Sequence, residues 1–149
     1  MVWLFAGGYG FAQAPFDRLA GQWSGTGTVD MASGARERIK CRASYDSLGD
    51  QKKLQLNIRC ASESYNFDLR ASASYAGGAV TGNWSESTRN VAGTISGRAD
   101  GENLQVVARA SAFTASLSLI THGGRQTVTI RPLDQQSDIR NVSISLKRG

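Results

Sequence analysis

Residues 71–84 read ASASYAGGAVTGNW, and they decide the fold because a Gly-Gly pair separates two runs in which small or apolar residues alternate with polar ones. A two-residue Gly-Gly loop tolerates the positive φ that tight hairpin turns require. Centring a hairpin on residues 77–78 places Ala73 opposite Gly82. One face of this hairpin is therefore small and apolar, as a half-buried antiparallel sheet requires.

The same construction extends along the chain from an Asp-Gly pair at 100–101 and a Gly-Gly pair at 123–124. Each turn fixes a register, because the residue numbers of every opposed pair in one hairpin add up to the same value. The predicted pairs are Ile95 with Val106, Gly93 with Ala108, and Leu119 with Val128. Every member of these pairs is apolar or small, so all three hairpins share one buried face.

Ten short strands follow from these and other turn signals. We expect them at residues 23–31, 36–46, 52–60, 65–75, 79–86, 91–98, 102–110, 113–121, 125–132 and 139–147. Short links make consecutive strands antiparallel neighbours, and closure of the last strand onto the first removes exposed edges. The sequence therefore predicts an all-β fold, an antiparallel up-and-down barrel of about ten strands. A flattened barrel or sandwich would bury the same residues.

The alternation also predicts which side chains face the interior. These are Trp23, Val29, Ile39, Tyr45, Leu56, Ile58, Phe67, Leu69, Val80, Trp84, Ile95, Val106, Leu117, Leu119, Ile130, Val142 and Ile144. Ser, Thr, Asn, Gln, Lys and Arg lie between them and should face outward.

Length and composition favour one barrel domain over residues 15–149, because 149 residues with 40% hydrophobic content leave no room for a second core. Residues 1–14 form a short apolar run that ends in Ala-Gln-Ala, which fits a signal-peptidase site. The missing basic n-region leaves an apolar N-terminal tail as the alternative. We expect a monomer that is periplasmic or secreted.

The two cysteines fall opposite each other when a hairpin is centred between residues 50 and 51, which pairs Cys41 with Cys60. Cα atoms of such a pair lie about 4.5–5.5 Å apart, within reach of a disulfide. The bond would agree with export, and two buried reduced thiols are the alternative. Besides these cysteines, the candidate metal ligand is His122, which lies in a turn. We therefore expect neither a metal site nor a redox motif.

The segment FDRLAGQWSGTG at residues 16–27 opens the first strand. Its Gly21-Gln22-Trp23 resembles the Gly-x-Trp element of the calycin superfamily, which includes lipocalins, fatty-acid-binding proteins and nitrobindin-like barrels. The Trp-x-Gly-x-Gly continuation is closer to the nitrobindin-like branch. The resemblance implies that Trp23 plugs the barrel floor after a short 3₁₀ turn and that a basic residue near the last strand, here Arg148, packs on it.

The resemblance also implies that a small apolar molecule binds in the lumen. The haem chemistry of the nitrobindin-like branch depends on a histidine from a late strand, and this chain has none there. His122 lies beside the Gly-Gly turn at 123–124 instead. We therefore expect no cofactor.

A row of small residues crosses five neighbouring strands in the predicted register: Ala73, Gly82, Gly93, Ala108 and Ala115. Glycine inside a strand often marks close approach of a ligand or another backbone, and a barrel of this size can hold a small ligand. We interpret the row as a pocket floor. The neighbouring rings of Tyr45, Phe67, Tyr75 and Trp84 either line this pocket or fill it, and both outcomes stay open.

The interior positions include almost no ionisable group, so a ligand held there should be neutral or mostly hydrocarbon, with its polar end near the rim. The hydroxyl groups of Tyr45, Tyr65 and Tyr75 are candidates for binding that end.

The outer face carries the excess of 17 basic over 12 acidic residues, a net charge of +5. Arg42 is predicted opposite Arg59, with Lys40 on the same face, and opposed like charges are usually disfavoured. The basic face would suit an anionic lipid or lipopolysaccharide, whose phosphates arginine binds bidentately. An ordinary solvated face is the alternative. Nucleic acid is not an expected partner, because outward aromatic residues for stacking are missing.

No nucleophile elbow, phosphate-binding loop or metal-ligand cluster occurs in the sequence, so an enzyme is not expected. The predicted function is an exported barrel that binds or carries a small apolar, lipid-like ligand. One alternative is a structural or interaction module of the cell envelope with a filled core. An outer-membrane barrel is the other, although the short strands and missing aromatic girdles argue against it.

Overall fold

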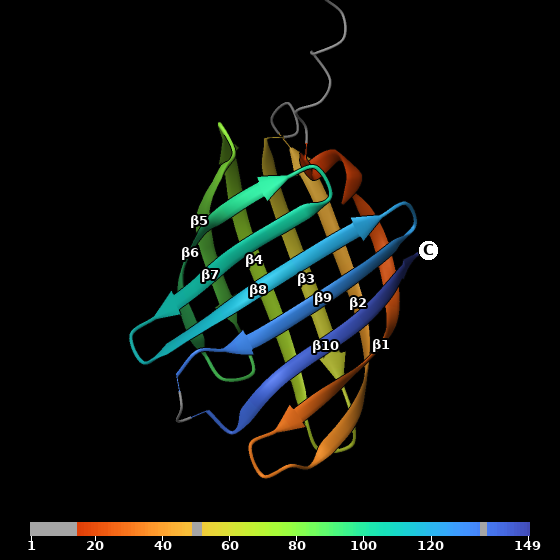
Figure 1. The fold of residues 1–149 in the computed structure, drawn as a ribbon, viewed down its shortest axis with the longest axis vertical. Helices are drawn as coiled ribbons and strands as arrows, with labels where there is room; N and C mark the ends of the chain where they lie inside the picture. The colour runs from red at the N-terminus through yellow and green to blue at the C-terminus, as the bar shows by residue number, and fades with distance from the viewer. Residues whose placement is uncertain (1–14, 49–51, 135–136) are drawn as a thin grey trace, which may run out of the picture.

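The computed structural model describes residues 15–48, 52–134 and 137–149, which form a closed barrel of ten antiparallel strands after a 3₁₀ helix at Pro15–Arg18 (Figure 1). The strands are β1 (Gly21–Met31), β2 (Arg36–Leu48), β3 (Lys53–Ala61), β4 (Asn66–Ala76), β5 (Ala79–Glu86), β6 (Val91–Asp100), β7 (Asn103–Ala110), β8 (Phe113–His122), β9 (Arg125–Pro132) and β10 (Ile139–Arg148). Each strand pairs with its chain neighbour, and β10 pairs with β1. The predicted fold class is confirmed, while residues 1–14, predicted as a signal peptide or an apolar N-terminal tail, lie outside the described residues.

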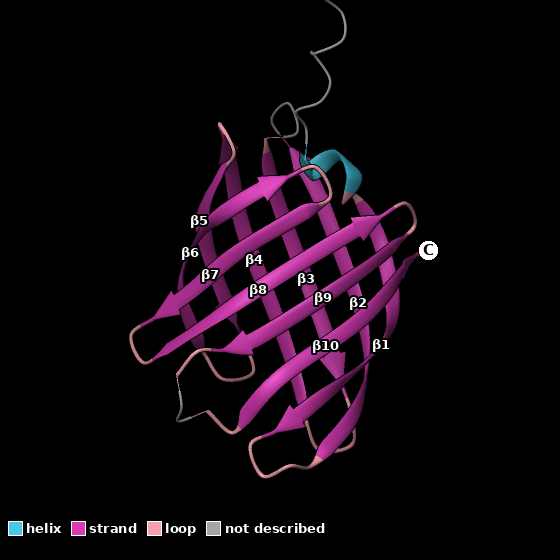
Figure 2. Cartoon of the chain, in the orientation of Figure 1, coloured by secondary structure: helices cyan, strands magenta, loops and turns pink. Residues whose placement is uncertain are grey.

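Most predicted registers are confirmed. Ala73 lies opposite Gly82 and Leu119 opposite Val128. Cys41 lies opposite Cys60 and forms the predicted disulfide, with its Cα atom 4.1 Å from that of Cys60. Strands make up nearly the whole described chain, and the connections between them are short (Figure 2).

The predicted register between β6 and β7 is wrong. Asp100 pairs with Asn103, so the loop is Gly101-Glu102 rather than Asp100-Gly101. Glycine occupies the first loop position here, with a φ of 54° that few other residues adopt. The pairing is therefore shifted by two residues, which places Ile95 opposite Ala108. Because side chains alternate with a period of two, every side chain stays on its predicted face.

The interior is apolar and the outer face is polar. Trp23, Ile58, Leu119 and Ile144 are among the fully buried side chains, whereas Ser, Thr, Lys and Arg alternate with the core positions on the outside. An outer-membrane barrel has the reverse arrangement, with its apolar band outward. Within the described residues, no helix has the length and apolar character needed to cross a membrane.

The two ends of the barrel differ. We call the end closed by the 3₁₀ helix the floor, and the opposite end the mouth. Connections β1–β2, β3–β4, β5–β6, β7–β8 and β9–β10 surround the mouth. At the floor, the Trp23 indole donates to the Leu19 carbonyl at 2.9 Å, and the Arg148 guanidinium carbon lies 4.4 Å from the centroid of the Trp23 ring. The arrangement inferred from the calycin resemblance is thus present.

Candidate functional site

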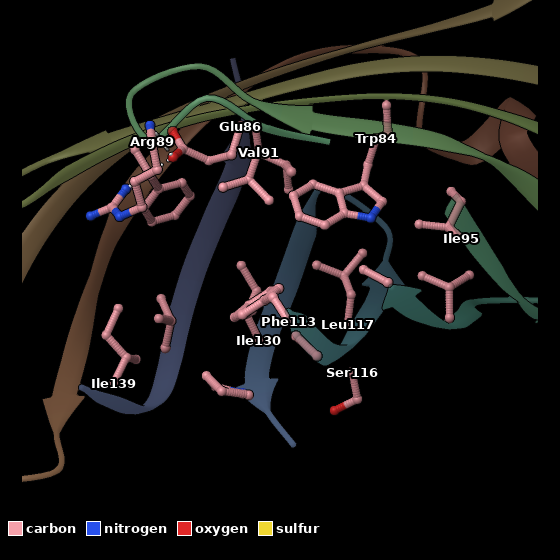
Figure 3. A pocket seen from close by; sticks show the side chains of 18 of the residues that line it. Trp84, Glu86, Arg89, Val91, Ile95, Phe113, Ser116, Leu117, Ile130 and Ile139 are labelled. Carbon is pink, nitrogen blue, oxygen red and sulfur yellow. Dashed lines mark hydrogen bonds and ion pairs between the residues drawn. The ribbon is translucent and has the colours of Figure 1, made fainter. Parts of the chain in front are cut away.

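The barrel encloses an apolar cavity of about 500 Å³ that extends to the turns at the mouth (Figure 3). Its wall is formed mainly by inward side chains of β3 to β10, because period-two alternation points every second residue into the lumen. The wall includes Leu54, Leu56, Phe67, Leu69, Ala71, Ala73, Val80, Trp84, Ile95, Val106, Ala108, Phe113, Ala115, Leu117, Ile130, Ile139 and Val142. The barrel is therefore hollow, and the filled-core alternative does not describe it.

Five of the residues predicted for the pocket line this cavity: Ala73, Ala108, Ala115, Phe67 and Trp84. The predicted row itself needs a correction, because the β5–β6 register places Gly82 opposite Ile95 rather than Gly93, and the β6–β7 register places Ile95 opposite Ala108. Ile95 takes the place of Gly93, so the row runs Ala73, Gly82, Ile95, Ala108 and Ala115. Methyl side chains from three strands leave room that a row of larger residues would fill.

Gly82 and Gly93 were predicted for the cavity floor, and neither belongs to its wall. A Cβ atom on Gly82 would overlap the carbonyl oxygen of Ser72 on β4, and one on Gly93 would overlap that of Arg109 on β7. Both glycines are needed because a neighbouring backbone comes close, the second of the two reasons for a strand glycine.

Tyr45 and Tyr75 also lie away from the cavity wall, in the floor half. The Tyr45 hydroxyl donates to the Gln126 side-chain carbonyl, and the Gln126 amide donates to the Thr121 hydroxyl at 3.0 Å. Burial raises the pKa of Tyr45. The Tyr75 ring packs edge-on against Phe16, with centroids 6.1 Å apart. These tyrosines fill the floor, and Tyr65 is the tyrosine that borders the cavity.

A charged pair, Glu86 and Arg89, lies at the mouth in the β5–β6 turn (Figure 3). The Glu86 carboxylate accepts hydrogen bonds from the backbone N–H groups of Asp68 at 2.9 Å and of Thr88 and Arg89 at 3.0 Å. The Thr88 hydroxyl and the Arg89 guanidinium also donate to it, at 2.6 and 3.1 Å. Arg89 then lies over the Tyr65 ring, 4.6 Å from its centroid.

These contacts set the ionisation of the cluster. Burial favours the neutral form of Glu86, but the hydrogen bonds from Asp68, Thr88 and Arg89 outweigh it and lower the pKa to about 2. Burial also raises the pKa of Tyr65, although the Arg89 charge opposes this shift. At neutral pH the mouth therefore holds a carboxylate whose charge is already satisfied by the protein.

A second mouth carboxylate orders another turn. Glu37 at the start of β2 accepts hydrogen bonds from the Ser62 and Ser64 hydroxyls, the latter at 2.7 and 2.6 Å to its two oxygens. The hydrogen bond from Ser62, followed by those from Ser64, lowers the pKa of Glu37. The β3–β4 turn is thus tied to β2 by one side chain.

Glu86 is not among the residues predicted for the site, although the sequence holds a signal for it. Glu86 continues the parity of Val80 and Trp84, so alternation alone points it inward. His122 lies at the floor end, 3.2 Å from a carboxylate oxygen of Glu102, and is exposed. Across the described ranges, no three His, Cys, Asp or Glu side chains group as metal ligands would.

The closed ten-strand topology and the hollow apolar interior together define an antiparallel up-and-down barrel with an internal cavity. Its fold is similar to the structure of the S-type phycobiliprotein lyase CPES from Guillardia theta, with a TM-score of 0.59, coverage of 90% of each chain and 10% sequence identity. A likeness at this identity shows a shared fold. No protein-family model and no curated protein matches the sequence.

Proposed function

We propose that this protein is an exported carrier that binds a small apolar, lipid-like ligand in the barrel cavity. The observation that carries the proposal is the apolar cavity of about 500 Å³ inside the barrel. Its size falls within the roughly 300–1,000 Å³ typical of small-molecule pockets. The mechanism is sequestration of the ligand without a chemical step.

The composition of the cavity wall favours a ligand whose buried part is uncharged. Glu86 is its buried charged residue, and Arg89 with three backbone N–H groups already neutralises and solvates that charge. A charged group deep in the lumen would meet only hydrocarbon and would lose its hydration. Polar groups of Tyr65 and Ser137 are at the mouth, where the polar end of the ligand belongs.

Filling the cavity tests this proposal. The variant Ala73→Leu/Ala115→Leu adds hydrocarbon to the cavity wall, and we expect it to weaken binding of the neutral dye N-phenyl-1-naphthylamine at least about tenfold in a fluorescence titration. Ala92→Leu makes the same chemical change at an exposed position of β6 and should leave affinity unchanged. Equal affinity in all three proteins would show that the dye does not occupy the lumen and would refute the proposal.

Export and cargo are tested by native mass spectrometry of protein purified from its own compartment without detergent. We expect a monomer that begins at Pro15, is two hydrogens lighter than the reduced chain, and carries an additional mass that leaves on denaturation. A chain that keeps residues 1–14 and lacks the disulfide would contradict export. A bare chain from that compartment, which also fails to bind the dye, would contradict the carrier function.

A further inference from the structure

Barrel closure assembles a row of basic side chains that no single hairpin contains. Arg125 on β9 lies opposite Lys147 on β10, and Lys147 lies opposite Ser24 on β1. Ser24 lies opposite Arg42 on β2, which in turn lies opposite Arg59 on β3. Four of five consecutive outward positions are cationic, and all five residues are exposed.

Strand β2 widens this row in the second direction. Arg38 and Lys40 precede Arg42 on the same outward face of the strand and are also exposed. We call the six residues the basic patch: Arg38, Lys40, Arg42, Arg59, Arg125 and Lys147. With strands about 4.8 Å apart and about 3.4 Å per residue, the patch spans roughly 19 Å across the strands and 13 Å along β2.

The protein supplies little counter-charge to the basic patch. Asp68 on β4 lies 3.9 Å from Arg59 and is shared with Arg70 at 3.8 Å. In the part of the chain that the structure describes, the other five patch residues form no ion pair. The opposed pairs Arg42–Arg59 and Lys147–Arg125 disfavour sheet pairing, so the patch does not contribute to folding stability through its charges.

We infer that the basic patch docks the barrel on the surface of an anionic lipid membrane. Its charges extend in two directions, as the phosphates of a bilayer surface do, whereas a single polymer chain would need one line of charge. The outward side chains of β1 between the two basic sides are small, namely Ser24, Thr26 and Thr28, so the long Arg and Lys side chains reach beyond them. Figure 1 shows β1 between β10 and β2 at one side of the barrel.

This docking does not depend on the proposed cargo. The basic patch lies on the outer face, while the cavity wall is formed by inward residues, and the two sets share no member. A barrel that failed to bind a ligand would still present the patch. For a barrel that is docked on a membrane, in turn, the bilayer would be a nearby source of the lipid-like ligand.

Vesicle sedimentation with two matched charge variants tests the inference on the full chain. The patch variant is Arg42→Ser/Lys147→Ser, and the control variant is Arg98→Ser/Arg109→Ser, which removes two exposed arginines on β6 and β7, strands that carry no patch residue. Vesicles contain phosphatidylcholine alone or an equal mixture with phosphatidylglycerol. Since each basic residue near an anionic surface contributes about a fivefold gain in partitioning, we expect the patch variant to bind mixed vesicles about 30-fold more weakly than wild type.

The control variant should lose less than about fivefold, because its arginines lie away from the docked face. Both variants should keep cooperative urea unfolding and wild-type dye affinity, which separates this test from that of the cavity. Equal losses in the two variants, or equal wild-type binding to neutral and mixed vesicles, would overturn the inference. Patch-dependent binding to heparin without binding to vesicles would overturn it too and would assign the patch to a linear polyanion.

Discussion

The floor and the mouth of this barrel are built from the same ten strands but are held together by different forces. Aromatic packing closes the floor, where Trp23 meets Tyr45 with ring centroids 6.4 Å apart and Phe16 is fully buried. At the mouth, Glu37 and Glu86 hold the turns through hydrogen bonds to backbone and hydroxyl groups. Apolar packing leaves no space, whereas turns held by carboxylates keep the end of a lumen shaped without filling it.

The largest expected effect comes from comparing the two buried tryptophans. Trp23→Ala should lower the free energy of unfolding by about 4 kcal/mol, because it leaves a void in the packed floor and removes the hydrogen bond to Leu19. Trp84→Ala also removes an indole hydrogen bond, to the Arg109 carbonyl at 3.3 Å, but it should cost about half as much, because the Trp84 ring already borders the cavity and its loss mainly enlarges existing space. Urea denaturation followed by far-UV circular dichroism measures both values.

Dye titration gives this pair a second readout. Trp84→Ala changes the shape of the cavity and should alter affinity for the neutral dye, while the folded fraction of Trp23→Ala should bind the dye as wild type does. Equal destabilisation of the two variants would show that the mouth is packed as tightly as the floor, and the contrast would then fail.

The disulfide stabilises the barrel wall without reaching the cavity. Replacing both cysteines, Cys41→Ala/Cys60→Ala, should lower unfolding stability by about 3 kcal/mol, the value expected for a short closed loop; here the cysteines lie 19 residues apart. Neither cysteine is part of the cavity wall, so dye affinity should be unchanged. Urea denaturation with and without reductant checks this, since reductant should lower the stability of wild type alone.

The sequence predicts the backbone of this molecule better than it predicts the cavity. Alternation and turn residues are local signals, and they predict all ten strands, the face of each residue and the Cys41–Cys60 pair. The β6–β7 register was missed because Asp-Gly is as good a two-residue loop as Gly-Glu on local grounds. Only the pairing of Asp100 with Asn103 in the folded sheet separates the two.

The cavity is harder to predict because emptiness depends on how rings from distant strands are oriented. Tyr45 and Trp84 both face inward. Tyr45, however, donates a hydrogen bond to Gln126 at the floor, while Trp84 borders the cavity. The close approach that requires Gly82 and Gly93 likewise depends on where the backbone of the neighbouring strand lies, which alternation does not encode. The two glycines were therefore wrongly predicted to line a pocket, because the space beside each of them is occupied by the backbone of a neighbouring strand.

Acid should weaken the mouth through Glu86. Its folded pKa is about 2 and its ordinary value 4.5, so ionised Glu86 stabilises the fold above about pH 4.5, and this contribution is lost as the pH falls towards 2. The shift from 4.5 to about 2 corresponds to about 3 kcal/mol at this buried group. Wild type should therefore lose stability more steeply between these pH values than Glu86→Gln, which lacks the titrating group.

Urea denaturation at a series of pH values measures this slope. Glu63→Gln, which removes a carboxylate from an exposed turn at the same end, should keep the wild-type slope. A Glu86→Gln protein with the wild-type slope would mean that other groups govern acid sensitivity, and the view of the mouth as held by Glu86 would have to be given up.

The smallest expected effect concerns the cation at the floor. Arg148 donates hydrogen bonds to the carbonyls of Ala20 and Arg18 while its guanidinium covers the Trp23 ring. Arg148→Lys keeps the charge but loses the planar fork, and it should cost about 1 kcal/mol. Because this contact involves no titrating carboxylate, the loss should be the same at pH 7 and pH 4. A loss that disappeared on acidification would mean that the floor, like the mouth, depends on ionised carboxylates.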